Sequence, residues 1–327
     1  MKRETSIKFF VQNLRIGGHQ TADHQGQRTD TLGRTGQANE LYSRARRFRE
    51  LVKKNDPDVI LTQECSTGWA DWMVKDAHMA ATYGLVYHWD GTNPPGMQSA
   101  SPILFKKETY ALEESGCFWF SETPDVISLP YCTEKEHPRI VSWTQLRDRK
   151  TGVSFRVYSL HMPNYRPRPL DPVGVKSMTQ LVNLFGDLPE GIYAFAGGDF
   201  NIDYRDDVYE HCLDWTKMID LKDQALNTGA EIGGNTGSVC PRYQKPETGG
   251  NYGTPEIIEA APNSQALDHL MAKPHPNIAV DYWGYDYTHM AIPEENVADG
   301  YVSDHYGLTV KLRIQTDEDH SEYQKKH

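Results

Sequence analysis

The sequence predicts an α/β fold in which two mainly antiparallel sheets pack together with helices on the outside. Short apolar stretches bounded by turn residues recur along the 327 residues, as is typical of strands. A few other stretches carry apolar residues at helical spacing. Successive strands often follow one another with no helix between them, which favours antiparallel pairing.

The first part of the chain contains two strands and two helices. A short apolar strand at 6–12 precedes a polar segment at 16–39, which predicts a long loop. A helix is expected from a cap at Asn39 to a stop at 55–57. A buried strand at 58–64 and a second helix at 67–80 follow.

The rest of the chain is rich in strands and has one further long loop, at 227–265. A helix is expected after the Asp171-Pro172 start signal and another at 206–218. Strands are expected at 83–89, 101–107, 109–120, 140–148, 153–161, 192–198, 266–272 and, as the last clear strand, 305–314. Residues 1–315 then form one domain, and 316–327 form a charged tail.

Composition narrows the functional classes. A net charge of −11 disfavours tight binding of nucleic acid, whose phosphates prefer basic surfaces. The five cysteines show no Cys-x-x-Cys pair, which argues against a zinc ribbon or a disulfide scaffold. No apolar run reaches the ~20 residues that span a bilayer. We expect a soluble monomer, cytoplasmic as the sequence stands, or secreted if a signal peptide has been removed.

Polar residues of one chemical type end several of the predicted strands. Carboxylates and amides dominate this set, with two histidines among them: Asn13, Glu64, His161, Asp199, Asn201, Asp268, Asp304 and His305. Oxygen ligands with few nitrogens suit Mg²⁺, with Mn²⁺ as the alternative, and not structural zinc. The set therefore predicts one hard-metal site with proton-transfer groups beside it.

The stretch AFAGGDFNID at 194–203 illustrates how the chain would build such a site. Taken alone, an aspartate after two glycines is more often a turn residue than a catalyst. We expect the two glycines to let the backbone turn sharply, so that Asp199 and Asn201 point toward one phosphate. The order and spacing of the polar strand ends across the chain favour the functional interpretation.

The ordered motifs QN, QE, SLH-x-P, GDFN, LDH and SDH resemble those of the endonuclease/exonuclease/phosphatase superfamily, which includes deoxyribonuclease I. The resemblance spans residues 6–313. It implies a four-layered α/β/β/α sandwich, with the active site at one end of the two sheets.

The resemblance also implies a role for each matching residue. Glu64 and Asp304 resemble metal-ligating carboxylates, and Asn13 a neighbour that ligates or orients. Asp199 resembles the group that activates water, and Asn201 a donor to phosphate. His305 resembles a phosphate contact held by Asp268, His161 a proton donor to the leaving oxygen, and Arg139 a phosphate-binding arginine.

The substrate is less well determined than the chemistry. We expect a metal-dependent phosphoesterase that hydrolyses a phosphodiester, and we favour a nuclease acting on nucleic acid over the alternatives. A phosphomonoesterase and a sphingomyelinase- or phospholipase C-like enzyme are the alternatives, and a non-catalytic binding module is a distant third. Arg166 and Arg168 either bind a distal phosphate or form a solvated pair, and both interpretations stay open.

Overall fold

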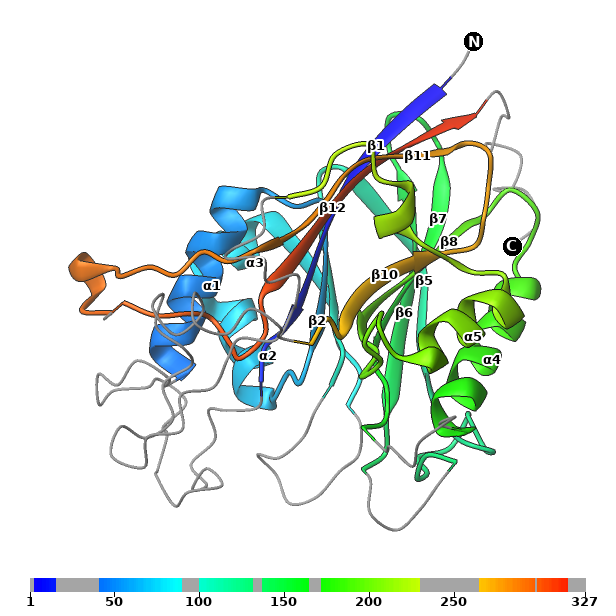
Figure 1. The fold of residues 1–327 in the computed structure, drawn as a ribbon. Coiled ribbons are helices and arrows are strands. Elements are labelled where there is room, and N and C mark those ends of the chain that lie inside the picture. The colour runs from blue at the N-terminus through cyan, green and yellow to red at the C-terminus, as the bar shows by residue number, and fades with distance from the viewer. Residues whose placement is uncertain are drawn as a thin grey trace.

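The computed structural model describes residues 3–15, 41–89, 100–131, 137–164, 172–229, 265–297 and 299–316. In these residues, two six-stranded sheets stack face to face, and helices cover the outer face of each (Figure 1). This confirms the predicted four-layered α/β/β/α sandwich. Both sheets are mixed: each contains one parallel pair of strands among its antiparallel neighbours.

The first sheet places the two ends of the chain side by side at its centre. It consists, in spatial order, of β11 (Ile278–Asp286), β12 (Gly307–Thr316), β1 (Arg3–Asn13), β2 (Val59–Gln63), β4 (Ile103–Lys106) and β3 (Tyr83–Val86). β1 pairs antiparallel with β12 and parallel with β2. β2 is buried along its whole length, as expected for a central strand with apolar residues on both faces.

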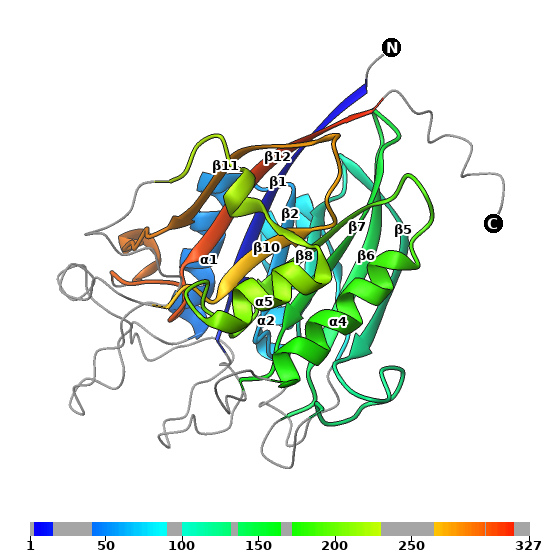
Figure 2. The same cartoon turned by 45° about the vertical axis from the view of Figure 1, so that its right-hand side comes forward.

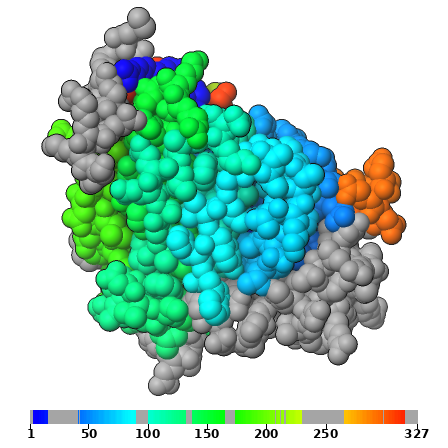
Figure 3. Space-filling view, turned by 180° about the vertical axis from the view of Figure 1, so that it is seen from behind, coloured from blue at the N-terminus to red at the C-terminus, as the bar shows by residue number. Residues whose placement is uncertain are grey.

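The second sheet comes from the middle of the chain. It consists, in spatial order, of β5 (Tyr110–Trp119), β6 (Ile140–Asp148), β7 (Ser154–His161), β8 (Tyr193–Asp199), β10 (Asp268–Ala272) and β9 (Ile219–Asp220). β7 pairs parallel with β8, and the crossover between them is a helix. Seen from behind, the cyan segments of the first sheet and its helices adjoin the teal segments of the second sheet (Figure 3).

Five α-helices of the described residues form the two outer layers. α1 (Leu41–Asn55), α2 (Thr67–Lys75) and α3 (Ala77–Thr82) cover the first sheet, and α4 (Pro172–Gly186) and α5 (Asp207–Thr216) cover the second (Figure 2). Within the described residues, no helix combines the length and apolar character that crossing a membrane requires.

The buried apolar residues form one cluster between the sheets and one under each helical layer. Phe9 of β1 meets Phe195 of β8 in the central cluster, with ring centroids 5.2 Å apart. Trp69 of α2 is fully buried in the cluster under α1 to α3, and Cys65 lies beside it as a packed thiol. The sheets are thus fixed against each other along their whole contact.

The helix after β2 and the strand β11 differ from what the sequence predicted. The helix predicted at 67–80 is broken at Asp76, which has an extended backbone and whose carboxylate accepts hydrogen bonds from His78 N and Met79 N. β11 was not predicted, because a bulge between Val280 and Tyr282 shifts its register and disrupts the alternation that marks a strand.

Several predictions lie outside the described residues. They concern the Asn39 cap, most of the loops at 16–39 and 227–265, the pair Arg166 and Arg168, and the tail from residue 317.

Candidate active site

The strand ends bring most of the predicted residues to one edge of the sandwich. Asn13 ends β1, Glu64 follows β2, His161 ends β7 and Asp199 ends β8. His161 and Asp199 are register partners in the parallel pair β7–β8, and Asp268 is opposite Asp199 on β10. Strand pairing therefore places His161, Asp199 and Asp268 next to one another, and the packing of the two sheets brings Asn13 and Glu64 to them.

Asn13 connects two of the carboxylates. It is fully buried, and its Nδ2 donates to Glu64 Oε1 at 3.2 Å and to Asp199 Oδ2 at 3.1 Å. Its Oδ1 accepts a hydrogen bond from the backbone N–H of Arg15 at 2.9 Å. Because these bonds fix both ends of the amide, the arrangement suits an orienting group for Glu64 and Asp199.

Asp199 lies at the centre of the site. The Nε2 atoms of His161 and His305 lie 3.4 Å and 3.8 Å from its Oδ2, and the backbone N–H of Asn201 donates to its Oδ1 at 2.8 Å. Burial raises the pKa of Asp199 to about 7; Asp268 and Glu64 act in the same direction and His305 opposes them. A carboxylate with such a pKa can accept a proton near neutral pH.

Asp268 and His305 form a buried pair. The Nδ1 of His305 donates to Asp268 Oδ2 at 2.7 Å, which leaves Nε2 facing Asp199. Burial disfavours the charged ring, but the Asp268 carboxylate overcomes it and raises the pKa of His305 to about 10. Gln12 Nε2 donates to the backbone carbonyl of His305 at 2.9 Å and holds the residue in place.

His161 has the opposite electrostatic character. Its burial, together with the positive charges of Arg139 and His305, lowers its pKa well below the ordinary value. The ring is therefore neutral, and its 3.4 Å contact with Asp199 is a contact of a neutral imidazole and not an ion pair. Arg139, which precedes β6, lies near enough to His161 for its positive charge to lower the pKa of the ring.

Asp304 lies against Arg15, a residue that the sequence analysis missed. Arg15 Nη1 is 2.6 Å from Asp304 Oδ2, and Ser303 Oγ donates to Asp304 Oδ1 at 3.2 Å. The side chain of Arg15 is 31% exposed, so it reaches the surface from the same edge as the carboxylates. Its position two residues beyond the strand end at Asn13 was the available signal.

The glycines of AFAGGDFNID do not make the sharp turn that was expected. Gly197 and Gly198 lie within β8. A Cβ on Gly198 would lie 1.9 Å from the carbonyl oxygen of Leu160, and one on Gly197 would lie 2.6 Å from Leu61 of the facing sheet. The two glycines let the neighbouring strand and the facing sheet approach β8 closely, and the backbone turns at Asn201 instead.

Three residues other than glycine at this edge have left-handed backbone conformations. Arg15, Glu64 and Asn201 have φ values of 50°, 51° and 52°. Such conformations cost on the order of 1 kcal/mol each and cluster where a chain positions functional groups. Asn201 is held there by its Nδ2, which donates to Met162 O at 2.8 Å.

The donor set fits a hard divalent cation. Four carboxylates, of Glu64, Asp199, Asp268 and Asp304, gather here, and Arg15 and the imidazolium of His305 supply fewer positive charges. Asp199, Asp268 and His305 have donor atoms within 4.8 Å of one another and could bind a metal. Because His305 is engaged with Asp268, however, the half-buried Glu64 is the better candidate for the principal ligand.

A second buried His–Asp pair supports the site from behind, and the sequence analysis did not identify it. His269 Nδ1 is 2.9 Å from Asp220 Oδ2, and its Nε2 is 2.8 Å from the carbonyl oxygen of Ile202. Tyr209 of α5 also donates to Asp220 Oδ2, at 2.7 Å. This network ties β10 to the turn at Asn201. His269 is the last residue of the LDH motif, but nothing in the sequence shows that it pairs with Asp220.

Comparisons with known proteins show the family and the fold of the chain. The model of the endonuclease/exonuclease/phosphatase family matches residues 25–305. No curated protein matches the chain closely enough to add to this. Among solved structures, a family protein of Bacteroides thetaiotaomicron is 21% identical, with a TM-score of 0.73 over 98% of this chain and 99% of its own.

Two further structures share the fold. A mannosyl-6-phosphatase of Bacteroides thetaiotaomicron VPI-5482 is 21% identical, with a TM-score of 0.71 over 94% of this chain and 99% of its own. TDP2 of D. rerio, solved with a single-stranded DNA product, is 15% identical, with a TM-score of 0.59 over 94% and 99%. Because the family model matches most of the chain, this protein belongs to the endonuclease/exonuclease/phosphatase family.

Proposed function

We propose that the protein is a metal-dependent phosphoesterase that hydrolyses its substrate by direct attack of water. The observation that carries this proposal is the chain of contacts from Asp268 through His305 to Asp199 and on through Asn13 to Glu64. It combines a charged histidine, a carboxylate with a pKa of about 7 and a half-buried carboxylate in one cluster. A base near neutral pKa and positive charge beside the phosphate are groups that phosphoester hydrolysis uses.

Each residue has a role that follows from its charge. Asp199 accepts the proton of the attacking water, since its pKa of about 7 suits a base at neutral pH. His305, as an imidazolium, contacts the phosphate through Nε2 and stabilises the developing negative charge. His161, which is neutral, donates a hydrogen bond and is poorly suited to be the proton donor that the resemblance implied.

Glu64 and Asp304 are the residues that would hold the metal, with Asn13 as the group that orients Glu64. A bound Mg²⁺ or Mn²⁺ would supply neutralisation of phosphate charge and a lower pKa for bound water. Asp304 has to share its carboxylate between the cation and Arg15, because Arg15 already contacts Oδ2. Arg139 and Arg15 then provide the remaining positive charges near the phosphate.

For the substrate, we place a small phosphomonoester ahead of nucleic acid. A mannosyl-6-phosphatase shares the fold with a higher TM-score than TDP2, which was solved with DNA. The net charge of −11 also repels a polyanion, whereas a small phosphate compound needs only local positive charge. A nuclease acting on a phosphodiester remains the second candidate, because TDP2 has the same fold.

The test is phosphate release from mannose 6-phosphate and glucose 6-phosphate, beside nicking of a supercoiled plasmid. Each assay is run with Mg²⁺, with Mn²⁺ and with EDTA. We expect metal-dependent phosphate release that falls at least about 100-fold in His305→Ala. Activity confined to the plasmid, and falling steeply with salt, would establish the nuclease instead.

A matched control is His275→Ala, which removes an exposed histidine that follows β10 at the end remote from the site. This variant should keep full activity. If the folded His305→Ala protein were as active as the wild type, the assigned site would be wrong. If the wild type hydrolysed neither class of substrate in any metal, the proposal for these substrates would be rejected.

A further inference from the structure

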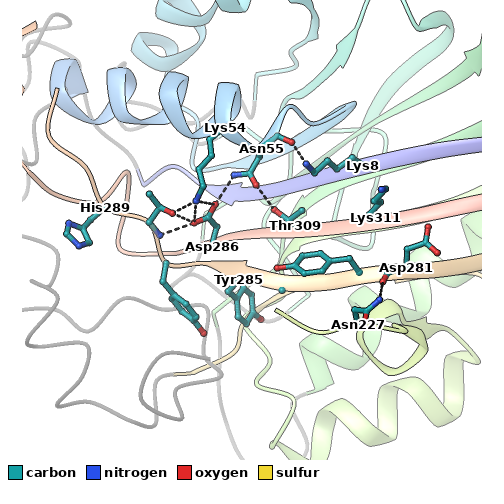
Figure 4. A pocket seen from close by; sticks show the side chains of 14 residues that line it. Lys8, Lys54, Asn55, Asn227, Asp281, Tyr285, Asp286, His289, Thr309 and Lys311 are labelled. Atoms are coloured by element: carbon teal, nitrogen blue, oxygen red, sulfur yellow. Dashed lines mark hydrogen bonds and ion pairs between the residues drawn. The ribbon is translucent and has the colours of Figure 1, made fainter. Parts of the chain in front are cut away.

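A hollow of about 1000 Å³ lies on the outer face of the first sheet, and none of the candidate active-site residues lines it (Figure 4). Its floor is formed by β1, β12 and β11 next to the C-terminal end of α1. The side chains that decide its chemistry are Lys8, Lys311, Tyr282, Asp281 and Asp286. A hollow of this volume accommodates a compound the size of a sugar phosphate or a nucleotide.

Two lysines face each other in the middle of this floor. Lys8 of β1 is the register partner of Lys311 of β12, and Lys311 is the register partner of Tyr282 of β11. The three side chains therefore form one row across three neighbouring strands. Like charges directly opposite each other destabilise a sheet unless an anion lies between them.

The carboxylates of the hollow do not neutralise this pair. Asp286 is bound by Lys54, Asn55 and Thr288 at one end of the hollow. At the other end of the hollow, Asp281 forms a bidentate ion pair with Arg313, whose Nε and Nη2 donate to Oδ2 at 2.9 Å and to Oδ1 at 2.8 Å.

The groups around the two ammonium groups also leave their positive charges incompletely neutralised. Lys8 donates to the carbonyl of Asn55 and lies near Asp56 and Asp58, but Lys106 pairs with both of those aspartates at 2.9 Å and 3.3 Å. Lys311 is exposed and makes no ion pair within the described part of the chain. Partial burial, opposed by Asp56 and reinforced by Lys311, lowers the pKa of Lys8.

Tyr282 provides a flat surface beside the lysines. A Cβ added to Gly284 would lie 2.7 Å from the hydroxyl oxygen of Tyr282, and a Cβ added to Gly229 would lie 2.5 Å from the same oxygen. The two glycines thus let the Tyr282 side chain lie along the strand instead of standing away from the sheet. Asn227 and Thr309 add amide and hydroxyl groups to the rim.

We propose that this hollow is a second, non-catalytic site for the phosphate group of a small phosphorylated compound. The phosphate lies between the ammonium groups of Lys8 and Lys311, and the ring of the compound rests on Tyr282. Both inorganic phosphate and a sugar phosphate present the required anion, and a sugar phosphate should bind more tightly because it also covers Tyr282. The site is separate from the proposed catalytic residues, so it does not depend on the proposed function.

The test is a lysine footprint on the full chain. Amine acetylation is followed by mass spectrometry with inorganic phosphate, glucose 6-phosphate, glucose or sulfate present. We expect phosphate and glucose 6-phosphate to slow labelling of Lys8 and Lys311 several-fold and glucose to have no effect. Lys150, an exposed lysine in the turn after β6, should be labelled equally in every sample.

Variants locate the effect. In Lys311→Gln, protection of Lys8 should need about tenfold more phosphate, because one charge-assisted contact is lost. Lys150→Gln should leave the protection curve unchanged. Unchanged labelling of Lys311 with both phosphate compounds would overturn the proposal, and so would equal protection by sulfate.

Discussion

Replacing Asp268 by asparagine tests the buried pair on which the charge of His305 depends. Asp268 is the largest of the contributions that raise the pKa of His305 from 6.5 to about 10. Without that charge, burial still lowers the pKa while Asp199 and Asp304 still raise it, so we expect the pKa to fall toward 6.5. At pH 7.5 the charged fraction of the ring then drops from nearly all to about a tenth, so we expect at least a tenfold loss of activity.

Nuclear magnetic resonance of the labelled imidazole gives the pKa directly. In the wild type His305 should stay charged from pH 6 to 9, and in Asp268→Asn it should titrate below pH 7. The matched control is Asp299→Asn, which removes the partner of His289, a more exposed pair with a contact of 2.8 Å. That variant should keep full activity. A wild-type His305 that titrates near 6.5 would refute the reasoning.

Three further predictions concern the same edge. Since burial raises the pKa of Asp199 to about 7, the reaction rate should rise with pH through about 7 and then level off. Bound Mg²⁺ should move the midpoint of this rise to lower pH. A rate that does not depend on pH between 5 and 8 would contradict the assignment of Asp199 as the base. Gly198→Ala should lose about 3 kcal/mol of unfolding free energy in urea denaturation, whereas Gly186→Ala, which meets nothing within 4 Å, should lose none. His269→Leu should cost about 3 kcal/mol in the same assay by leaving the Asp220 charge buried without its imidazole, and a loss below 1 kcal/mol would show that the pair is not structural.

Much of the fold could be predicted because its strands are short apolar stretches bounded by turn residues, and because the motifs resemble those of a family with a known sandwich fold. The buried strand at β2 and the run before Asp199 are apolar on both faces, and both proved central. β11 escaped prediction for a physical reason: the bulge at Val280–Tyr282 displaces its side chains from a two-residue period. The break at Asp76 escaped because aspartate is tolerated inside helices as well as at their ends.

For the candidate site, the sequence predicted which strand ends would meet but not how their side chains are paired. Asn13 was expected to ligate or to orient, and its contacts with Glu64 and Asp199 favour the second role. Arg15 lies in no motif, and the LDH motif contains His269 without showing its role, because both residues depend on partners far away in sequence, at Asp304 and Asp220. Such pairings are set by tertiary packing, which no local pattern encodes.

The site is assembled across the interface between the two sheets, and this links its chemistry to the packing of the core. Asn13 and His305 belong to the first sheet and its immediate flank, whereas Asp199 and Asp268 belong to the second. The bonds Asn13–Asp199 and His305–Asp268 therefore bridge the sheets. A change in sheet spacing would lengthen both bonds together, lowering the pKa of His305 and releasing Asp199. Close packing at the interface, including the contact of Gly197 with the facing sheet, is thus part of what positions the reacting groups.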